Sequence, residues 1–497
     1  MRKICALMLS VILMLSVAAC GNSPAASSSA SSGNANSELI DISGEITGEI
    51  TVSAYDTMRS APFLQDAARL FEEKYPGTSV NIETFSSMPE IKTSEQGGRT
   101  MSMVQMIDDP QGRQDYINKV STEMMSGGGA DVLSMDVLPL HKYAESGSLE
   151  NLDEYMLSDA DFDRSAFREN VFDALKYRGN TWFLPASYSF EYFAYDNTLI
   201  GDDKFGISSA FSTEQLFELA KTAHNGSTQL FNQPAYQEMA GSGMWRSLLE
   251  ENYLQFVDIE NKKANFNDGT FAQLLNSVVE YSEQGYLPKS SGAPNANMMM
   301  QAGNNSGERF YFKANSAFTL MNQFTRNSGR RMNIATAGSV RAIDTDDDIA
   351  GICANTDGSV PFTYEQAYGI NSGSKNKQTA WAFIKFLLDE DMQMNTNLSP
   401  AFQPVRNSSR PQKAESMFTG AFMGQPGQPL DDNQKLALTE YTKTVEALSD
   451  LISCYNWNDT VVDDMISSEV KYFFDGSKTA DEVAATLQNK VELYLSE

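Results

Sequence analysis

The chain has 497 residues, of which 37 are lysine or arginine and 65 are aspartate or glutamate, so its formal net charge is −28 at pH 7. A chain this acidic repels polyanions, which makes nucleic acid an unfavourable partner. The same charge keeps a protein soluble, so the acidity by itself indicates no particular ligand.

The first 19 residues have the order of a bacterial secretory signal. Two basic residues precede an apolar run over residues 4–17, and two alanines stand directly before Cys20. The run is shorter than the roughly 20 residues that a membrane-spanning helix needs, so we expect residues 1–19 to be removed as a signal peptide. The ending VAAC resembles the lipobox of bacterial lipoproteins, which implies a lipid on Cys20 that anchors the protein to the extracytoplasmic face of the cell membrane. An ordinary secretory signal with a cysteine at its cleavage site is the alternative.

A flexible tether is expected to follow over residues 20–38. It consists almost wholly of Gly, Ser, Ala and Asn, which bury too little apolar surface to order themselves. Folded structure should begin near residue 39. More than 450 residues then remain, which exceeds what one hydrophobic core organises, so we expect two lobes.

The first half of the folded part alternates strands and helices. EITVSAY (49–55) predicts a strand and APFLQDAARLFEEKYPG a helix that ends at a Pro-Gly pair, because its apolar residues recur at helical spacing. Strands are expected at 78–85 and 130–136, with a helix between them. This order favours a mostly parallel sheet covered by helices, and such sheets bind ligands at the carboxyl ends of their strands. Tyr55 and Asp136 lie at two such ends.

Further along, an aromatic segment over residues 179–200 contains a predicted strand, YFAYDN. Helices are expected over 212–226, 241–254 and 270–285, the first and last opened by Ser or Thr caps. We predict a strand over 316–324 and a helix in TAWAFIKFLLDEDM. The remainder, from residue 431, predicts about three helices and no strand.

Several separated segments together resemble the extracellular solute-binding proteins of bacterial ABC transporters, in particular the large carbohydrate-type family 1. They are LQDAARLFEEKYPGTSVNIETF, GGGADVLSMDVLPLHKYAESGSLENLDEYM, WFLPASYSFEYFAYDNTL, AYGINSGSKNKQTAWAFIKFLLDEDMQ and FQPVRNSS. The resemblance implies an α/β, two-lobed, periplasmic-binding-protein-like fold of type II with a helical C-terminal region. Its discontinuous lobes would comprise residues 39–192 with 366–400 and residues 193–365 with 401–497. The hinge crossings would be YFAYDN, QAYGINSG and AFQPVRNSS.

A sugar site needs aromatic platforms and side chains that exchange hydrogen bonds with hydroxyl groups. Eight residues meet these needs near expected strand ends or hinges: Tyr55, Asp136, Tyr188, Glu191, Trp245, Phe324, Tyr364 and Glu365. Asp136 could equally cap the helix that follows it, and Phe324 could equally belong to the core. Trp182 and Trp381 are expected in the core, whereas Trp457 could serve either role.

The resemblance implies that the protein captures a mono- or oligosaccharide and delivers it to the permease subunits of an ABC importer, as a monomer and without a cofactor. Peptides, polyamines or other organic cations are the alternative ligands, because an acidic domain with aromatics can hold positive charge. A surface lipoprotein active on polysaccharide is the second alternative, since a glycosidase needs two carboxylates. His141 and His224, the two histidines, sit in no catalytic motif, so we expect no enzyme.

No metal site is expected. The acidic run DTDDDIAG (344–351) lacks the glycine and glutamate of a calcium loop, so it is expected to be a solvated loop. The sequence does not decide whether Cys353 and Cys454 pair. Two inserts, a Met-rich one at about 88–111 and NANMMMQAGNNSGE, depart from the family pattern and either line the site or form surface loops.

Overall fold

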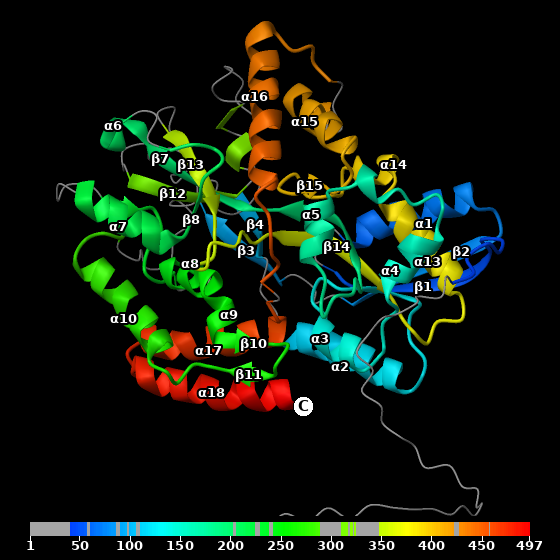
Figure 1. Ribbon diagram of the computed structural model, residues 1–497, viewed down its shortest axis with the longest axis horizontal. Coiled ribbons are helices and arrows are strands. Elements are labelled where there is room, and N and C mark those ends of the chain that lie inside the picture. Colours follow the sequence, from blue (N-terminus) through cyan, green and yellow to red (C-terminus); the bar gives the residue numbers. More distant parts are fainter. Residues whose placement is uncertain are drawn as a thin grey trace, which may run out of the picture. The chain divides into compact units, whose positions relative to one another are not determined.

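The computed structural model describes residues 40–56, 60–85, 90–96, 99–105, 110–201, 205–223, 229–237, 242–288, 310–316, 319–321, 323–324, 347–421, 427–456 and 458–497. The expected signal peptide, Cys20 and the tether lie outside the described residues, as do His224, Trp457 and the NANMMMQAGNNSGE insert. Residues Leu39–Glu497 form one compact unit. It contains two large mixed sheets, each covered by its own helices (Figure 1).

The first sheet has six strands in the order β15-β6-β14-β5-β1-β2. Their bounds are β1 (Gly48–Tyr55), β2 (Thr78–Phe85), β5 (Val132–Ser134), β6 (Leu184–Ser189), β14 (Thr363–Ile370) and β15 (Gln403–Pro404). β1 runs parallel to β2 and β5, whereas β14 runs antiparallel to β5 and β6. The strands predicted from residues 49 and 78 are confirmed, and the one predicted at 130–136 is shorter than expected.

Helices before the third crossing that cover this sheet are described in several parts of the chain. They include α1 (Ser60–Lys74), α2 (Pro110–Met125), α3 (Leu140–Glu145), α4 (Leu152–Ser158), α5 (Glu169–Ala174), α13 (Lys377–Leu387) and α14 (Glu390–Gln393). α1 buries Phe63, Leu64, Ala67 and Phe71, the stripe that its helical spacing predicts. The Phe71 ring meets Phe383 of α13 edge-on with centroids 5.3 Å apart, so helices far apart in sequence share one core.

The second sheet has five strands in the order β8-β13-β7-β12-β9. Their bounds are β7 (Glu191–Asp196), β8 (Ala210–Phe211), β9 (Gln229–Phe231), β12 (Phe310–Ser316) and β13 (Asp347–Cys353). Around them lie α6 (Asn197–Ile200), α7 (Thr213–Ala223), α8 (Met244–Glu251), α9 (Tyr253–Phe256), α10 (Thr270–Glu283), α17 (Thr460–Phe474), α18 (Ala480–Ser496) and the hairpin of β10 (Val257–Asp258) with β11 (Lys263–Ala264). The helices predicted over 212–226, 241–254 and 270–285 correspond to α7, α8 and α10.

Two predictions in this lobe are wrong. The strand expected over 316–324 ends at Ser316, because β12 lies earlier, and residues 319–321 and 323–324 are helical. Leu320, Met321 and Phe324 stand at i, i+1 and i+4, which is helical spacing. In so short an apolar run this spacing cannot be told from the alternation of a strand, which explains the wrong prediction. The acidic run at 344–351 is not wholly a loop, since β13 begins at Asp347.

Over the residues that the structure describes, three crossings between the two sheets can be followed. β6 passes directly into β7 through the buried residue Phe190, and β13 leads to β14 through residues 354–362. QAYGINSG therefore belongs to β14 of the first sheet and follows its crossing. The third crossing expected at AFQPVRNSS is wrong, because Gln403 pairs with Tyr188 inside the first sheet. It occurs instead over residues 450–459, between α16 (Asp432–Ser449) and α17.

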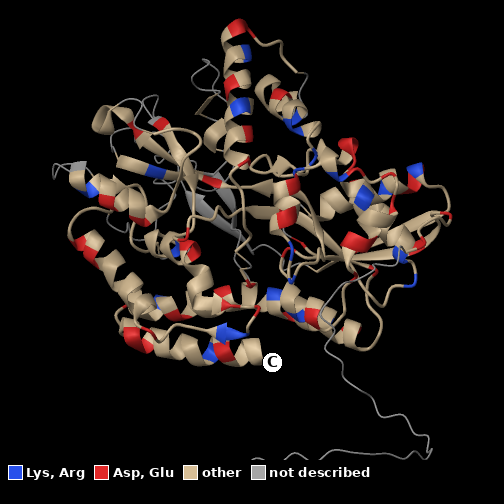
Figure 2. Cartoon of the chain, viewed as in Figure 1, with Lys and Arg blue, Asp and Glu red and all other residues tan. Residues whose placement is uncertain are grey.

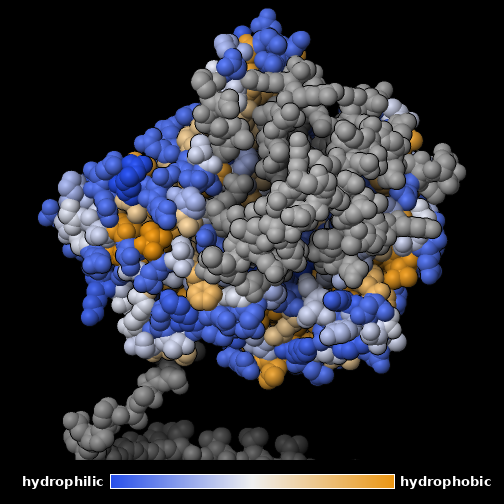
Figure 3. Space-filling view, turned by 180° about the vertical axis from the view of Figure 1, so that it is seen from behind, coloured by the Kyte–Doolittle hydropathy of each residue, from blue (hydrophilic) through white to orange (hydrophobic). Residues whose placement is uncertain are grey.

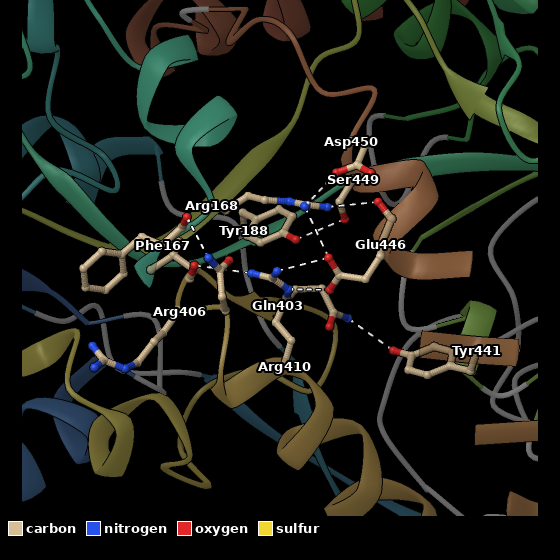
Figure 4. Close-up of polar contacts among 12 residues, drawn as sticks. Phe167, Arg168, Tyr188, Gln403, Arg406, Arg410, Tyr441, Glu446, Ser449 and Asp450 are labelled. Atoms are coloured by element: carbon tan, nitrogen blue, oxygen red, sulfur yellow. Dashed lines mark hydrogen bonds and ion pairs between the residues drawn. The ribbon is translucent and has the colours of Figure 1, made fainter. Parts of the chain in front are cut away.

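The start of that third crossing is fixed to the first lobe by ion pairs (Figure 4). Arg168, just before α5, donates to Asp450 at 2.8 Å and to the main-chain oxygen of Glu446 at 3.0 Å. Arg410 of α15 (Ser409–Thr419) pairs with the Glu446 carboxylate at 2.6 Å. Both guanidinium side chains are nearly buried, so these contacts hold the C-terminal end of α16 in place.

A separate two-stranded hairpin consists of β3 (Glu90–Gln96) and β4 (Arg99–Gln105). It forms most of the predicted Met-rich insert. In the view of Figure 2, acidic and basic residues are intermixed over the described helices of both lobes. Where the rear face is described, its surface is mainly hydrophilic with separate hydrophobic patches (Figure 3). The net negative charge is therefore dispersed.

Candidate ligand-binding site

The expected ligand-binding edge of the first sheet is formed by the carboxyl ends of β1 and β5 and the amino end of β14. Asp136 follows β5, while Tyr364 and Glu365 open β14. The antiparallel pairing of Tyr368 with Ser134 brings the start of β14 beyond the end of β5. The structure thus brings together three of the eight predicted site residues, and Tyr55 ends β1 on the same edge.

Asp136 holds this edge together through both carboxylate oxygens. Its Oδ1 accepts from the Ala367 main-chain NH at 3.2 Å and its Oδ2 from the Ser134 hydroxyl at 2.9 Å. Burial raises the pKa of Asp136 to about 7; the hydrogen bonds oppose that rise, and the charge of Glu365 adds to it. Asp136 does not cap the following helix, because α3 begins at Leu140 after Pro139 and receives no hydrogen bond from a side-chain cap.

Aromatic rings flank this carboxylate. The half-buried Tyr364 ring lies between Phe183 at 5.0 Å and Tyr455 at 5.1 Å, and its hydroxyl donates to the Met135 carbonyl at 3.4 Å. Tyr55 is 7% exposed and its ring packs against Phe85. The accessible aromatic surface here therefore comes from Tyr364 and Tyr455 rather than from Tyr55.

The second sheet contributes Glu191, the first residue of β7, directly after the first crossing. Its side chain is exposed, yet protein atoms around it displace enough water to raise the pKa of its carboxyl to about 7, and the charge of Glu250 adds to that rise. An accessible carboxylate that is poorly hydrated is a strong acceptor for a ligand hydroxyl or cation. Phe324 is half-buried and meets Tyr441 of α16 edge-on at 6.0 Å.

Two predicted site residues expose no surface in this structure. Trp245 is fully buried in α8 and its indole NH donates to the Ser242 carbonyl at 3.2 Å. Tyr188 is also fully buried, and its hydroxyl bonds the Ser449 hydroxyl at 3.0 Å, as Figure 4 shows. Trp381, expected in the core, is buried as predicted.

Sequence reasoning missed Tyr455 and Gln366. Tyr455 belongs to the third crossing, whose position was predicted elsewhere in the chain. Gln366 has a left-handed backbone with φ of 59°, is fully buried, and accepts a hydrogen bond from the Tyr368 hydroxyl. Non-glycine residues in this conformation are strained and concentrate at functional sites. No sequence signal marks such a φ at a glutamine.

A small pocket of about 30 Å³ adjoins Tyr364. It is lined by Leu138, Pro139, Leu140, His141, Ile259, Tyr364, Tyr455, Asn458 and Asp459. Its volume accommodates about one water molecule, so a sugar ring must lie on the wider surface beside it. Burial lowers the pKa of His141 to about 4 and raises that of Asp459 to about 6, while His141 Nδ1 lies 3.3 Å from Asp459 Oδ2.

Neither metal nor disulfide chemistry is evident in the described part of the chain. No group of three or more His, Cys, Asp or Glu residues there is arranged to hold a metal ion. Cys353 and Cys454 are free thiols, and burial raises the pKa of both. The chemistry that these residues offer is hydrogen bonding and ring stacking.

The fold consists of two mixed β-sheets covered by helices and joined by three described crossings. Carboxylates and aromatic rings lie near these crossings, which is the arrangement of a two-lobed binding protein. The chain belongs to the bacterial extracellular solute-binding proteins: the model of that family matches residues 93–419. Membership implies an extracytoplasmic location. Among the described helices, none has both the length and the apolar character that crossing a membrane would require.

Solved structures share the fold. An extracellular solute-binding protein family 1 from Alicyclobacillus acidocaldarius is 15% identical, with a TM-score of 0.54 over 91% of this chain and all of that one. The sugar-binding protein MalE from Xanthomonas citri is 13% identical, with a TM-score of 0.54 over 90% and 97% of the two chains. The GacH receptor of Streptomyces glaucescens is 16% identical, with a TM-score of 0.51 over 91% and 100%. At these identities the likeness establishes the fold.

Proposed function

We propose that the protein captures a mono- or oligosaccharide between its lobes and delivers it to the permease of an ABC importer. The observation that carries the proposal is the pairing of poorly hydrated carboxylates with accessible tyrosines at the crossings. Asp136 and Glu191 supply acceptors from the two sheets, and Tyr364 with Tyr455 supplies apolar ring faces. Sugars present hydroxyl donors and C–H faces, which is what this combination recognises.

Structural relatives of the protein support a carbohydrate ligand. The Streptomyces glaucescens receptor is described in complex with acarbose, and a substrate-binding protein from Listeria monocytogenes, with a TM-score of 0.50, in complex with cycloalternan. The Xanthomonas citri protein is described as sugar-binding. Each shares the fold of this chain.

Binding would work by a shift between conformations. A ligand that touches Asp136 on one lobe and Glu191 on the other binds the closed arrangement better than an open one, so it raises the closed population. We place the protein on the extracytoplasmic face of the membrane as a monomer, held by a lipid on Cys20. No covalent chemistry is needed, and ATP hydrolysis would belong to other subunits.

A cationic ligand is the second candidate, and one observation favours it. The charge of Glu250 adds to the negative potential at the exposed Glu191, and an ammonium group would relieve this repulsion. A polyamine, a basic peptide or an amino sugar therefore belongs beside neutral sugars in the binding panel. Hydrolysis of polysaccharide, the third candidate, would show as product release.

The test is isothermal titration calorimetry of the soluble form that starts at residue 34, against neutral and amino sugars, maltooligosaccharides, peptides and polyamines. We expect heat and thermal stabilisation with a saccharide, and no product on prolonged incubation. Glu191→Gln should weaken binding tenfold or more, whereas Glu218→Gln, an exposed carboxylate in α7, should leave it unchanged. If no saccharide releases heat, the carbohydrate assignment fails; if cations alone do, the second candidate replaces it.

A further inference from the structure

Three residues from both lobes meet in one ionic cluster, which we call the clasp: Glu145, Arg178 and Lys262. Glu145 ends α3 in the first lobe, and its Oε1 and Oε2 each lie 2.9 Å from the Arg178 Nη2 and the Lys262 Nζ respectively. The Tyr177 hydroxyl also donates to Oε1 at 2.8 Å. Glu145 is 17% exposed, so water screens this carboxylate less than a surface one.

The two cations reach Glu145 from different lobes. Arg178 lies in the turn before β6 of the first sheet, where Tyr177 and Asn180 exchange main-chain hydrogen bonds. Lys262 lies in the turn that joins β10 to β11. That hairpin belongs to the second lobe, because Phe256 beside it packs on Phe271 of α10 with ring centroids 5.3 Å apart.

Arg178 also reaches across to the same hairpin. Its Nη2 donates to the Glu260 main-chain oxygen at 2.7 Å, so one guanidinium bonds a carboxylate of its own lobe and a carbonyl of the other. Burial would raise the pKa of Glu145, but the hydrogen bonds from Lys262 and Tyr177 and the charge of Arg178 outweigh burial and lower it. The carboxylate is therefore held in its charged form.

The backbone at both cations is unusual. Among the described residues, three that are not glycine have positive φ, and two of these are Arg178 at 51° and Lys262 at 56°. Arg178 precedes Gly179 at 81°, which gives a two-residue turn in which Asn-Gly is the favoured pair. Turn positions of this kind favour Gly, Asn or Asp, so a long cation at each one runs against local preference.

We propose that Glu145, Arg178 and Lys262 form an interlobe clasp that stabilises the arrangement of the lobes seen here and so sets how readily the site opens. Its consequence for ligand capture rests on the proposed function. The clasp itself is a property of the ligand-free chain, so it can be tested separately. Salt should weaken it, because two of its three side chains are about half exposed.

The experiment measures the distance between the lobes by pulsed electron spin resonance in the soluble form that starts at residue 34, without ligand. Spin labels are placed on Leu157→Cys of α4 and Leu219→Cys of α7, both exposed, with Cys353 and Cys454 replaced by serine. Lys262→Met removes the second-lobe cation. The matched control is Lys377→Met, because Lys377 pairs with Glu150 at the same 2.9 Å and similar exposure, but inside the first lobe.

We expect Lys262→Met to lower the population at the distance of this structure, relative to more open distances, by about two- to fivefold. Added salt should shift the parent chain in the same direction and shift Lys262→Met much less. Lys377→Met should match the parent chain. The proposal is overturned if Lys262→Met and Lys377→Met give the same distances and the same salt response. Failure of every sugar to bind would leave this result standing.

Discussion

A buried carboxyl beside the site makes the stability of the protein depend on pH in a way that one substitution can isolate. Glu251 ends α8 and is 8% exposed. Both of its carboxylate oxygens accept from the Thr213 main-chain NH at 2.8 Å. Burial nonetheless raises its pKa from 4.5 to about 8, and the nearby charges of Glu191 and Glu250 add to the rise.

The sign of the effect follows from proton binding. Between pH 4.5 and 8 the folded chain keeps a proton on Glu251 that the unfolded chain has lost, so the free energy of unfolding falls as pH rises through this range. The maximal slope is about 1.4 kcal/mol per pH unit, and the whole shift corresponds to roughly 5 kcal/mol. Glu251→Gln removes this titration while it keeps an oxygen for Thr213.

The assay is urea unfolding from pH 5 to pH 9, with the parent chain, Glu251→Gln and the exposed control Glu218→Gln. Other carboxyls with raised pKa values titrate in the same range, so the informative quantity is the difference between curves. We expect Glu251→Gln to become more stable relative to the parent chain as pH rises, and Glu218→Gln to run parallel to it. Parallel curves for Glu251→Gln and the parent chain would mean that Glu251 is ionised in the folded state, and the reasoning would fail.

Three further predictions follow from the same structure. Arg410→Met should lower the free energy of unfolding by about 1 to 3 kcal/mol in urea titration, because it leaves Glu446 with Arg168 alone at 3.2 Å; no change would show that the cluster in Figure 4 contributes nothing. Gly243→Ala should lower the free energy of unfolding by more than about 2 kcal/mol, because φ is 131° and the new Cβ would stand 2.8 Å from two carbonyl oxygens. Gly476→Ala, where φ is 78° and the Cβ would enter open space, should lower it by about 1 kcal/mol. Equal losses for the two variants would contradict the clash at Gly243. Sugar affinity, measured by calorimetry, should rise from pH 6 to pH 8 as Asp136 and Glu191 ionise, by up to about tenfold for each carboxylate, and Asp136→Asn should remove its share of the rise; a rise that the substitution leaves unchanged would show that Asp136 does not contribute.

Local patterns predicted local structure well. The run from β1 through α1 to β2 followed from alternation, helical spacing and a Pro-Gly stop, all of which act within a few residues. The position of the third crossing did not follow from local patterns. A two-residue strand, β15, joins the first sheet by pairing with β6, which lies more than two hundred residues earlier in the chain. Such pairing depends on tertiary contacts that no local pattern encodes.

Local patterns also predicted some of the site residues and failed for others. The strand-end rule predicted Asp136 at the edge of the first sheet, but Tyr364 and Glu365 were expected in the second lobe or its hinge and instead open β14, which runs antiparallel to β5 and so starts at that edge. Burial of Trp245 and Tyr188 could not be foreseen, since an aromatic beside a glycine loop or hinge is equally able to face ligand or core. Tyr455 was missed because its crossing was expected elsewhere.

Three carboxyl groups near the crossings have raised pKa values, which the positions of these residues in the sequence do not indicate. Asp136, Glu191 and Glu251 all lie at or beside the crossings, and each loses stability at neutral pH that an amide of the same shape would keep. Glu251 bonds protein donors and so has a structural use. Glu191 is exposed, and the one ionisable neighbour that shifts its pKa is another acid, so its poor hydration benefits the fold in no way that the described contacts provide. A ligand that donates to this exposed carboxylate when the lobes close would offset the repulsion from Glu250, so Glu191→Gln tests the proposed site directly.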